Sequence, residues 1–321
     1  MHCESEAVIF SPTSASAEIT SYISRTKLSL GKTRDRCQVR NMISSSSQQF
    51  DRSDQAKAYS QFRPDPPKEL VEVIISYLEE EVPDPFGLAV DVGCGTGQST
   101  LVLAPHFRSV LGCDVSKSQV REAVLSRKAS NVQYRVSAAE CLPVGDESVH
   151  LLTAGTCFHW LDIPAFFKEA KRVLVPGGVL AIYSSCAIYP VMGDEEKDYQ
   201  LRILTNKLLY DDLKAYRSPK VQQVFEQYSN VEFPFEDVVR SRNIGHTYVA
   251  CAADAMGYIK SMSTFQNLRA VYPFRADQLL QDYQDSLMNI LNVSTEPEST
   301  PLAYRRDYFL ILCRKDKRKT K

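Results

Sequence analysis

The sequence lacks an excess of charge of either sign, a cluster of cysteines and a long apolar run. Its 321 residues carry 38 basic and 39 acidic side chains, for a net charge of −1. This balance argues against wholesale binding to nucleic acid or to an anionic membrane. No apolar run approaches the roughly 20 residues of a membrane-spanning helix. The first 30 residues also lack the basic and apolar regions of a secretory signal.

Cysteine and histidine are too scattered to predict a metal site. No two of the nine cysteines are closer than 16 residues, which excludes a Cys-x-x-Cys metal motif and a dense disulfide framework. His106, His150 and His246 show no metal-ligand spacing. We therefore expect no bound metal and a reducing compartment, with the cytoplasm as the predicted location.

The first 49 residues differ from the rest of the chain. Eleven of them are serine, and they sustain neither a helical nor a strand period. This composition predicts a disordered extension over 1–49, followed by one folded domain over 50–321. Six basic residues between positions 25 and 40 leave mitochondrial import as an alternative. Glu4, Glu6 and Glu18 disfavour it, because transit peptides avoid acids.

Strand and helix patterns alternate between residues 88 and 184. Buried-strand patterns occur at 88–92, 109–114, 132–136, 149–154 and 179–184. Helical periods or short connections separate them, most clearly at 116–128 and 164–174. The alternation predicts an α/β fold, Rossmann-like and doubly wound, with a mostly parallel sheet. Ligands of such sheets bind at the carboxyl ends of the strands.

The pattern changes after this region. Residues 186–235 are polar, helical in tendency and rich in tyrosine and phenylalanine, so we expect a helical insertion that caps the site. Strands are expected at 238–244 and 308–313. Helices are expected at 252–262 and 276–290.

A glycine-rich turn follows the first strand and carries the main functional signal. Gly93, Gly95 and Gly97 would let the backbone turn sharply and approach a ligand closely. A dinucleotide fingerprint needs Gly-x-Gly-x-x-Gly, but Gln98 stands at the third glycine position, which disfavours a nicotinamide dehydrogenase. With Asp91 two residues ahead, the pattern favours S-adenosylmethionine, whose amino acid part the turn would hold while Asp91 also braces it.

Two later positions support the same ligand. Asp114 ends the next strand, where a carboxylate can accept hydrogen bonds from both ribose hydroxyls. A simple helix cap at Ser116 is the alternative interpretation of Asp114. Ala139 and Glu140 lie in a turn that could reach the adenine edge, although Ala138 stands where many sequences carry Asp.

The chain resembles the class I, seven-stranded S-adenosylmethionine-dependent methyltransferases. The motifs that carry this resemblance are Asp91-Val-Gly-Cys-Gly-Thr-Gly97, Asp114, Ala139-Glu140-x-Leu-Pro143 and Leu174-x-Pro-Gly-Gly178. The resemblance covers about residues 50–185 and implies a seven-stranded sheet and S-adenosylmethionine as cofactor.

A closer resemblance is to a subgroup related to trans-aconitate methyltransferase and similar small-molecule enzymes. The motifs are Tyr59-x-x-Phe62-Arg63-Pro64, His159-Trp160, Gly257-Tyr258 and Ser261-x-Ser263. This likeness leaves the substrate of the present chain undetermined.

Four residues complete the candidate site. His159 is the leading candidate for a general base, with a passive pocket wall as the alternative. Arg63 and Tyr59 are further candidates for the catalytic site, Arg63 as an anion contact, although both could be ordinary surface side chains. Thr156 follows the fourth strand and is expected beside the cofactor.

The sequence as a whole predicts methyl transfer to a small-molecule acceptor, with a carboxylate or hydroxyl oxygen favoured. Thr156-Cys157-Phe158 replaces the motif associated with methylation of nucleic-acid amines, so no nucleic-acid partner is expected. The alternatives are a non-catalytic cofactor-binding or scaffold protein and, less favoured, an NAD-dependent dehydrogenase. The oligomeric state stays open.

Overall fold

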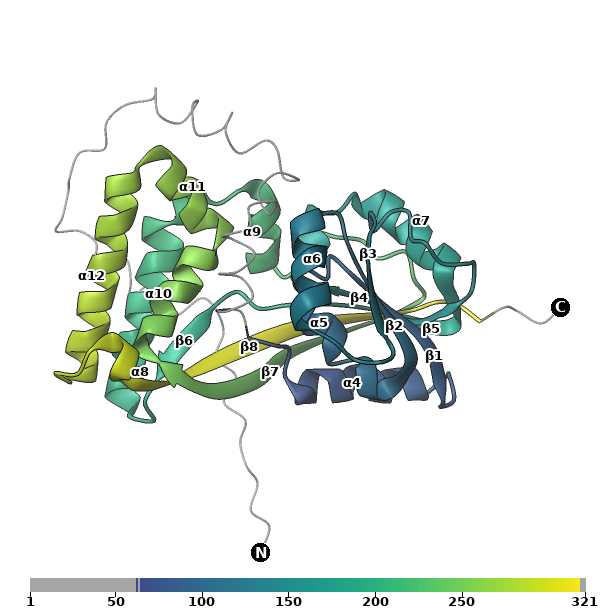
Figure 1. Cartoon of the computed structure of the whole chain (residues 1–321), viewed down its shortest axis with the longest axis horizontal. Helices are drawn as coiled ribbons and strands as arrows, with labels where there is room; N and C mark the ends of the chain where they lie inside the picture. The colour runs from purple at the N-terminus through teal and green to yellow at the C-terminus, as the bar shows by residue number, and fades with distance from the viewer. Residues whose placement is uncertain (1–61, 63, 318–321) are drawn as a thin grey trace, which may run out of the picture. The chain divides into compact units, whose positions relative to one another are not determined.

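The computed structural model describes residue 62 and residues 64–317 (Figure 1). The predicted extension 1–49 and the candidates Tyr59 and Arg63 lie outside these described residues. No helix in the described ranges is long and apolar enough to cross a membrane.

Five parallel strands form the first part of the sheet, as the alternation predicts. Their order is β3-β2-β1-β4-β5, so the chain reverses direction across the sheet between β1 and β4. The strands are β1 (Phe86–Val92), β2 (Phe107–Asp114), β3 (Val132–Val136), β4 (Val149–Gly155) and β5 (Leu174–Ser184). The helical segments around them are α4 (Lys68–Glu79), α5 (Gln98–Leu101), η2 (Ala104–His106), α6 (Lys117–Ser126), η3 (Phe158–Trp160) and α7 (Ile163–Val173).

Three antiparallel pairings around β8 (Pro301–Arg314) complete the sheet. The second half of β8 pairs with β5, and its first half pairs with β6 (Ile188–Val191). β7 (Asp237–Cys251) pairs with β8 along its whole length. Since β7 occupies one side of β8, β5 and β6 share the other side. The described sheet therefore has eight strands in seven positions across, which explains the seven-stranded expectation.

The two faces of the sheet are covered by different helices. Leu180, Ile182 and Ile311 belong to a buried cluster that contains the α7 side chains. Val179 and Leu310 belong to a second cluster that contains the apolar side of α4. Alternate residues of one strand face opposite sides, and α4 and α7 accordingly lie on opposite faces (Figure 1).

A third cluster lies where β6, β7 and β8 extend toward a group of helices (Figure 1). The predicted cap segment 186–235 contains β6, two α-helices and two short helical turns. Three further helices, which follow β7, pack into the same cluster. The helical elements are α8 (Glu195–Asn206), η4 (Lys207–Asp212, a π-helix), η5 (Lys214–Tyr216), α9 (Pro219–Phe225), α10 (Ala252–Ser261), α11 (Ser263–Val271), α12 (Pro273–Leu291) and η6 (Pro297–Ser299).

The structure corrects several predicted boundaries in this second half. The expected strands at 238–244 and 308–313 are parts of much longer strands, and β6 and α11 were not predicted. Charged and polar residues interrupt the apolar pattern where β7 and β8 extend beyond the part of the sheet that α4 and α7 cover. The two strands nevertheless continue to pair with each other there.

Arg314, at the end of β8, ties this strand to α4 and to the start of β5. Its buried guanidinium donates to the carbonyl oxygen of Tyr77 (2.7 Å) and to Glu80 (2.8 Å). It also donates to the carbonyl of Gly177 (3.4 Å) and stacks 3.9 Å from the centre of the Tyr77 ring. The Tyr77 hydroxyl donates to Asp237 (2.5 Å), which brings β7 into the same network.

Replacing Arg314 should therefore destabilise the sheet. We expect Arg314→Met to lower the free energy of unfolding by about 1–3 kcal/mol, because buried carbonyl groups lose their donor. Denaturant-induced unfolding measures this change. Lys68→Met is the control, since the ion pair of Lys68 with Glu72 is exposed and should contribute less than about 1 kcal/mol. Equal effects of the two substitutions would contradict the role given to Arg314.

Candidate active site

The glycine turn after β1 has the backbone that its sequence predicts. Gly93, Gly95 and Gly97 all have positive φ, at 58°, 55° and 91°. At Gly93 a Cβ atom would also lie 2.6 Å from the Cβ of Cys157, closer than non-bonded carbons approach. Glycine is therefore required at Gly93 both for its backbone conformation and for its contact with the segment after β4.

Asp91 lies behind this turn and faces away from the cavity. Its side chain is fully buried, and its carboxylate accepts hydrogen bonds from the hydroxyls of Ser99, Thr100 and Thr153, each at 2.7 Å. Burial raises the pKa of Asp91, while the hydroxyl donors act in the opposite direction. These contacts join β1, α5 and β4, so Asp91 braces the turn. The predicted direct contact of Asp91 with the cofactor stays a prediction.

A cavity of about 370 Å³ opens at the carboxyl ends of the strands, where the fold predicts a ligand. Predicted site residues from four separate segments line it. They are Gly93, Gly95, Asp114, Ala139, Glu140, Thr156 and His159. Its far wall comes from α9, α10 and the start of α11, so the helical region closes over the strand ends.

Asp114 reaches from the end of β2 toward the glycine turn. One carboxylate oxygen accepts from the backbone N–H of Gly95 (2.9 Å), and the other accepts from that of Ser116 (2.8 Å). Ser116 caps α6 by accepting from the Gln119 N–H, so the helix-cap role belongs to the serine. Asp114 also lines the large cavity, and its expected contact with the ribose hydroxyls stays a prediction.

The turn after β3 forms another wall of the cavity and is fixed to α7. Glu140 accepts a hydrogen bond from the backbone N–H of Asp162 (2.9 Å), next to the start of α7. Ala139 is buried and lines the cavity beside Glu140. A planar ligand edge can therefore meet backbone groups of this turn.

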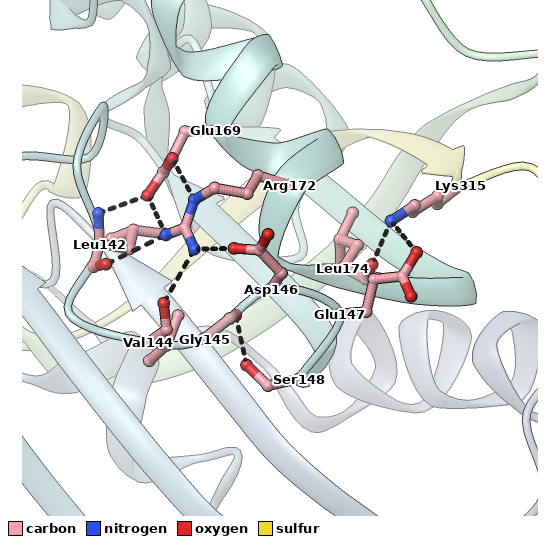
Figure 2. A network of polar contacts seen from close by, with 10 residues as sticks. All are labelled: Leu142, Val144, Gly145, Asp146, Glu147, Ser148, Glu169, Arg172, Leu174 and Lys315. Carbon is pink, nitrogen blue, oxygen red and sulfur yellow. Dashed lines mark hydrogen bonds and ion pairs between the residues drawn. The ribbon is translucent and has the colours of Figure 1, made fainter.

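An ion-pair network holds the loop that follows this turn (Figure 2). Arg172 of α7 donates to Glu169 (2.6 and 2.8 Å), to Asp146 (2.7 Å) and to the carbonyl groups of Leu142 and Val144. Glu169 in turn accepts from the Leu142 N–H (2.6 Å). The hydrogen bonds from Arg172 lower the pKa of Glu169, so its carboxylate stays ionised. The network thereby fixes the predicted adenine side of the cavity against α7.

Thr156 has an unusual backbone at the end of β4. Its φ is +56°, a conformation that β-branched residues rarely adopt and that costs roughly 1–3 kcal/mol. The surrounding structure holds it there through a hydrogen bond from its N–H to the Tyr183 carbonyl (2.8 Å). Strain of this kind concentrates at functional sites, and Thr156 borders both the large cavity and a smaller one of about 50 Å³.

His159 lies in the cavity wall with a protein partner. Its Nδ1 is 3.0 Å from the Tyr228 hydroxyl, and its side chain is buried. Burial, with a smaller effect from the positive charge of Lys220, lowers the pKa of His159 to about 3. A ring with this pKa is neutral at physiological pH and is a weak general base. The geometry favours the pocket-wall interpretation of His159 over the base.

Three residues of the site escaped the sequence analysis. Arg306 of β8 is buried and donates from Nε to the Ser185 hydroxyl (2.6 Å). Ser185 lines the large cavity, while Arg306 lines the small cavity beside Gly93, Gly95 and Thr156. Gln98 Nε2 is buried and has no hydrogen-bond partner among the described residues, whereas Gln98 Oε1 accepts a hydrogen bond from Thr96. In the sequence, Arg306 stands out only as a charged residue next to an expected strand, and such residues are too common to indicate a site.

Comparison with known proteins supports a single class for this fold and site. Residues 90–182 match the family described as "Methyltransferase domain". A Dictyostelium discoideum protein with a provisional methyltransferase name is 29% identical over 262 residues, 81% of this chain and 93% of that protein. A solved structure titled as a type II methyltransferase, also provisionally, from Anaeromyxobacter dehalogenans has a TM-score of 0.65 at 25% identity. That comparison covers 79% of this chain and 99% of the other.

A further relative matches a shorter stretch. The malonyl-[acyl-carrier protein] O-methyltransferase of Hahella chejuensis is 36% identical over 116 residues, 35% of this chain and 40% of that protein. The fold and the glycine turn resemble those of the class I methyltransferases. With these matches, they show that the chain is an S-adenosylmethionine-dependent methyltransferase.

The residues at the strand ends fit the cofactor that this class implies. The cavity volume lies within the range of small-molecule sites. The glycine turn suits the amino acid part of the cofactor, because its backbone lets a ligand approach closely. Asp114 suits the ribose, and the turn at Ala139 and Glu140 suits the adenine.

The assignment of Asp114 to the ribose predicts a selective loss of affinity. We expect Asp114→Asn to bind S-adenosylhomocysteine at least tenfold more weakly than the unaltered protein, because a charged acceptor is lost. The variant should also no longer distinguish S-adenosylhomocysteine from its 2′-deoxy analogue. Calorimetry measures both affinities, and Glu79→Gln, at the exposed end of α4, is the control. Undiminished discrimination in Asp114→Asn would overturn the assignment.

Proposed function

We propose that the protein transfers the methyl group of S-adenosylmethionine to a carboxylate oxygen of a small-molecule acid. The observation that carries this proposal is that the site contains a buried cation, Arg306, but only a weak base, His159. Arg306 and Ser185 border the cavities at the strand ends, and His159 has a pKa of about 3. A hydroxyl acceptor would need a group that removes its proton, whereas a carboxylate is already ionised near neutral pH.

The residues of the chain then have separate tasks. When bound, S-adenosylmethionine supplies an activated methyl group that leaves its sulfonium sulfur for an oxygen nucleophile. Arg306 holds the acceptor carboxylate by its planar guanidinium, which presents several donors to an anion. Ser185 orients Arg306 through the 2.6 Å hydrogen bond to Nε. His159, whose ring is held by the Tyr228 hydroxyl, forms part of a wall that excludes water and keeps the acceptor in place.

One comparison supports an oxygen acceptor, because the Hahella relative is named as an O-methyltransferase. The resemblance to the trans-aconitate subgroup, which stays a prediction from the sequence, points to carboxylic acids. The comparisons favour a methyltransferase over the dehydrogenase and scaffold alternatives. A small-molecule partner, the absence of a nucleic-acid partner, cytoplasmic location and a capping role for 186–235 remain part of the proposal.

The proposal predicts that methyl transfer is nearly independent of pH. Between about pH 6 and 9, the carboxylate acceptor stays ionised and His159, with a pKa of about 3, stays neutral. We expect the maximal rate to vary by less than about threefold in this range. Transfer of a labelled methyl group to a panel of carboxylic acids measures it, with the affinity for S-adenosylhomocysteine as control at each pH. A rate that rises with an apparent pKa between 6 and 8 would instead require a base and a hydroxyl acceptor.

The role of Arg306 predicts a change in one kinetic parameter. We expect Arg306→Lys to raise the KM for the acid about tenfold or more, because the charge remains but the planar set of donors is lost. The affinity for S-adenosylhomocysteine should change by less than about threefold. Arg305→Lys is the matched control, since Arg305 is exposed and paired with Asp307. A loss of S-adenosylhomocysteine affinity equal to the rise in KM would assign Arg306 to the carboxylate of the cofactor.

A further inference from the structure

A second cavity of about 250 Å³ lies within the helical region and adjoins the large cavity. Its walls come from α8, the π-helix η4, α10, α12 and the three strands β6, β7 and β8. Tyr258 and Met262 line both cavities. Pro64 lines the second cavity and also the small cavity beside Arg306. The second cavity is therefore adjacent to the place where we put the acceptor carboxylate.

Four polar side chains in the wall of this second cavity already have protein partners. Thr205 Oγ1 donates to the Leu201 carbonyl (2.9 Å) and lies 3.2 Å from the Tyr283 hydroxyl. The Tyr304 hydroxyl donates to the Cys251 carbonyl (2.8 Å). Asp254 accepts from the Cys251 N–H (2.8 Å) as part of the cap of α10. A polar occupant would gain little from these groups, because their main hydrogen bonds are made.

The remaining wall is aliphatic and aromatic. The side chains that matter here are Ile188, Leu208, Leu209, Ala255 and Ile259. Leu208 and Leu209 belong to the π-helix, a rare form that is frequent at functional sites. Such a wall favours an apolar occupant, since its burial removes apolar surface from water.

Gly257 explains how one side of the second cavity closes. A Cβ atom at this position would come within 2.3 Å of the Phe62 ring, so α10 must present its bare backbone there. Phe62 thereby packs directly on α10 and forms part of the cavity wall. The Gly257-Tyr258 pair, which the sequence comparison with the subgroup singled out, thus shapes this cavity through both of its residues.

We propose that the second cavity binds an apolar tail of the acceptor, whose carboxylate is held beside Arg306. The acceptor class is then a monocarboxylic acid with an aliphatic or aromatic chain. This inference rests on the proposed function for the position of the carboxylate. The position and chemistry of the tail come from the second cavity alone.

A series of straight-chain acids of increasing length tests the proposal. We expect kcat/KM for methyl transfer to rise about fourfold per added methylene until the cavity is filled. Ala255→Leu, which places a larger side chain in the wall, should end this rise at a shorter chain. Leu209→Ala should extend it to longer chains, so that the two variants move the optimum in opposite directions. Ala253→Leu, on the same helix but outside the cavity wall, should leave the length dependence unchanged.

Calorimetry of the same acids in the presence of S-adenosylhomocysteine separates the two proposals, because it needs no turnover. Long acids that bind and are excluded by Ala255→Leu, without any methyl transfer, would support the tail cavity and overturn the proposed acceptor. Methyl transfer with the same length dependence in all four proteins would support the acceptor and overturn the tail cavity. Acids that neither bind nor accept methyl would overturn both. Thermal unfolding shows whether each variant is folded. If either Ala255→Leu or Leu209→Ala does not fold, the other still tests the proposal, because the two should shift the optimal chain length in opposite directions.

Discussion

The hydrogen bonds of β8 to three other strands hold the described chain together. Its second half completes the parallel sheet beside β5, and its first half carries β6 and the helices that follow. Arg314 fixes one end of the strand to α4. Arg306 lies in the other half, opposite Ile188 of β6. The position of the helical wall relative to the glycine turn is therefore set by backbone pairing, with side-chain packing added to it.

Polar groups in this structure follow two patterns. The buried Asp91 and the partly exposed Arg172 have their hydrogen bonds made by protein groups, and each holds a segment next to the wall of the large cavity. At the strand ends, by contrast, Thr156 has a strained backbone and Gln98 keeps a buried donor without a described partner. Satisfied groups give rigidity, whereas strain and an open donor are costs that a bound ligand can offset. Asp91 and Arg172 therefore support the site, whereas Thr156 and Gln98 belong to the site itself.

The nucleotide side of the site could be proposed from the sequence because its determinants are local. Glycines, a buried strand and an acid at the next strand end can each be read from a few neighbouring residues, and the structure brings Gly95 and Asp114 into contact. The acceptor side depends on long-range pairing. Arg306 and Ser185 are 121 positions apart, and their hydrogen bond requires β8 to lie beside the segment after β5. The role of His159 was also beyond the sequence, since its pKa depends on burial and on the distant Lys220.

The arrangement of cavities divides recognition between two parts of the fold. The parallel sheet contributes the glycine turn and Asp114, to which we assign the cofactor, so this part of the site would be the same for any acceptor. The helical region contributes walls from segments between 186 and 304, where no single motif dictates the shape. Tyr258 and Met262 border both cavities, so a change in the tail cavity alters the wall of the transfer site. Under the proposed function, selection of the acceptor and the rate of transfer would be coupled through α10, and substitutions in its cavity-facing residues should change both together.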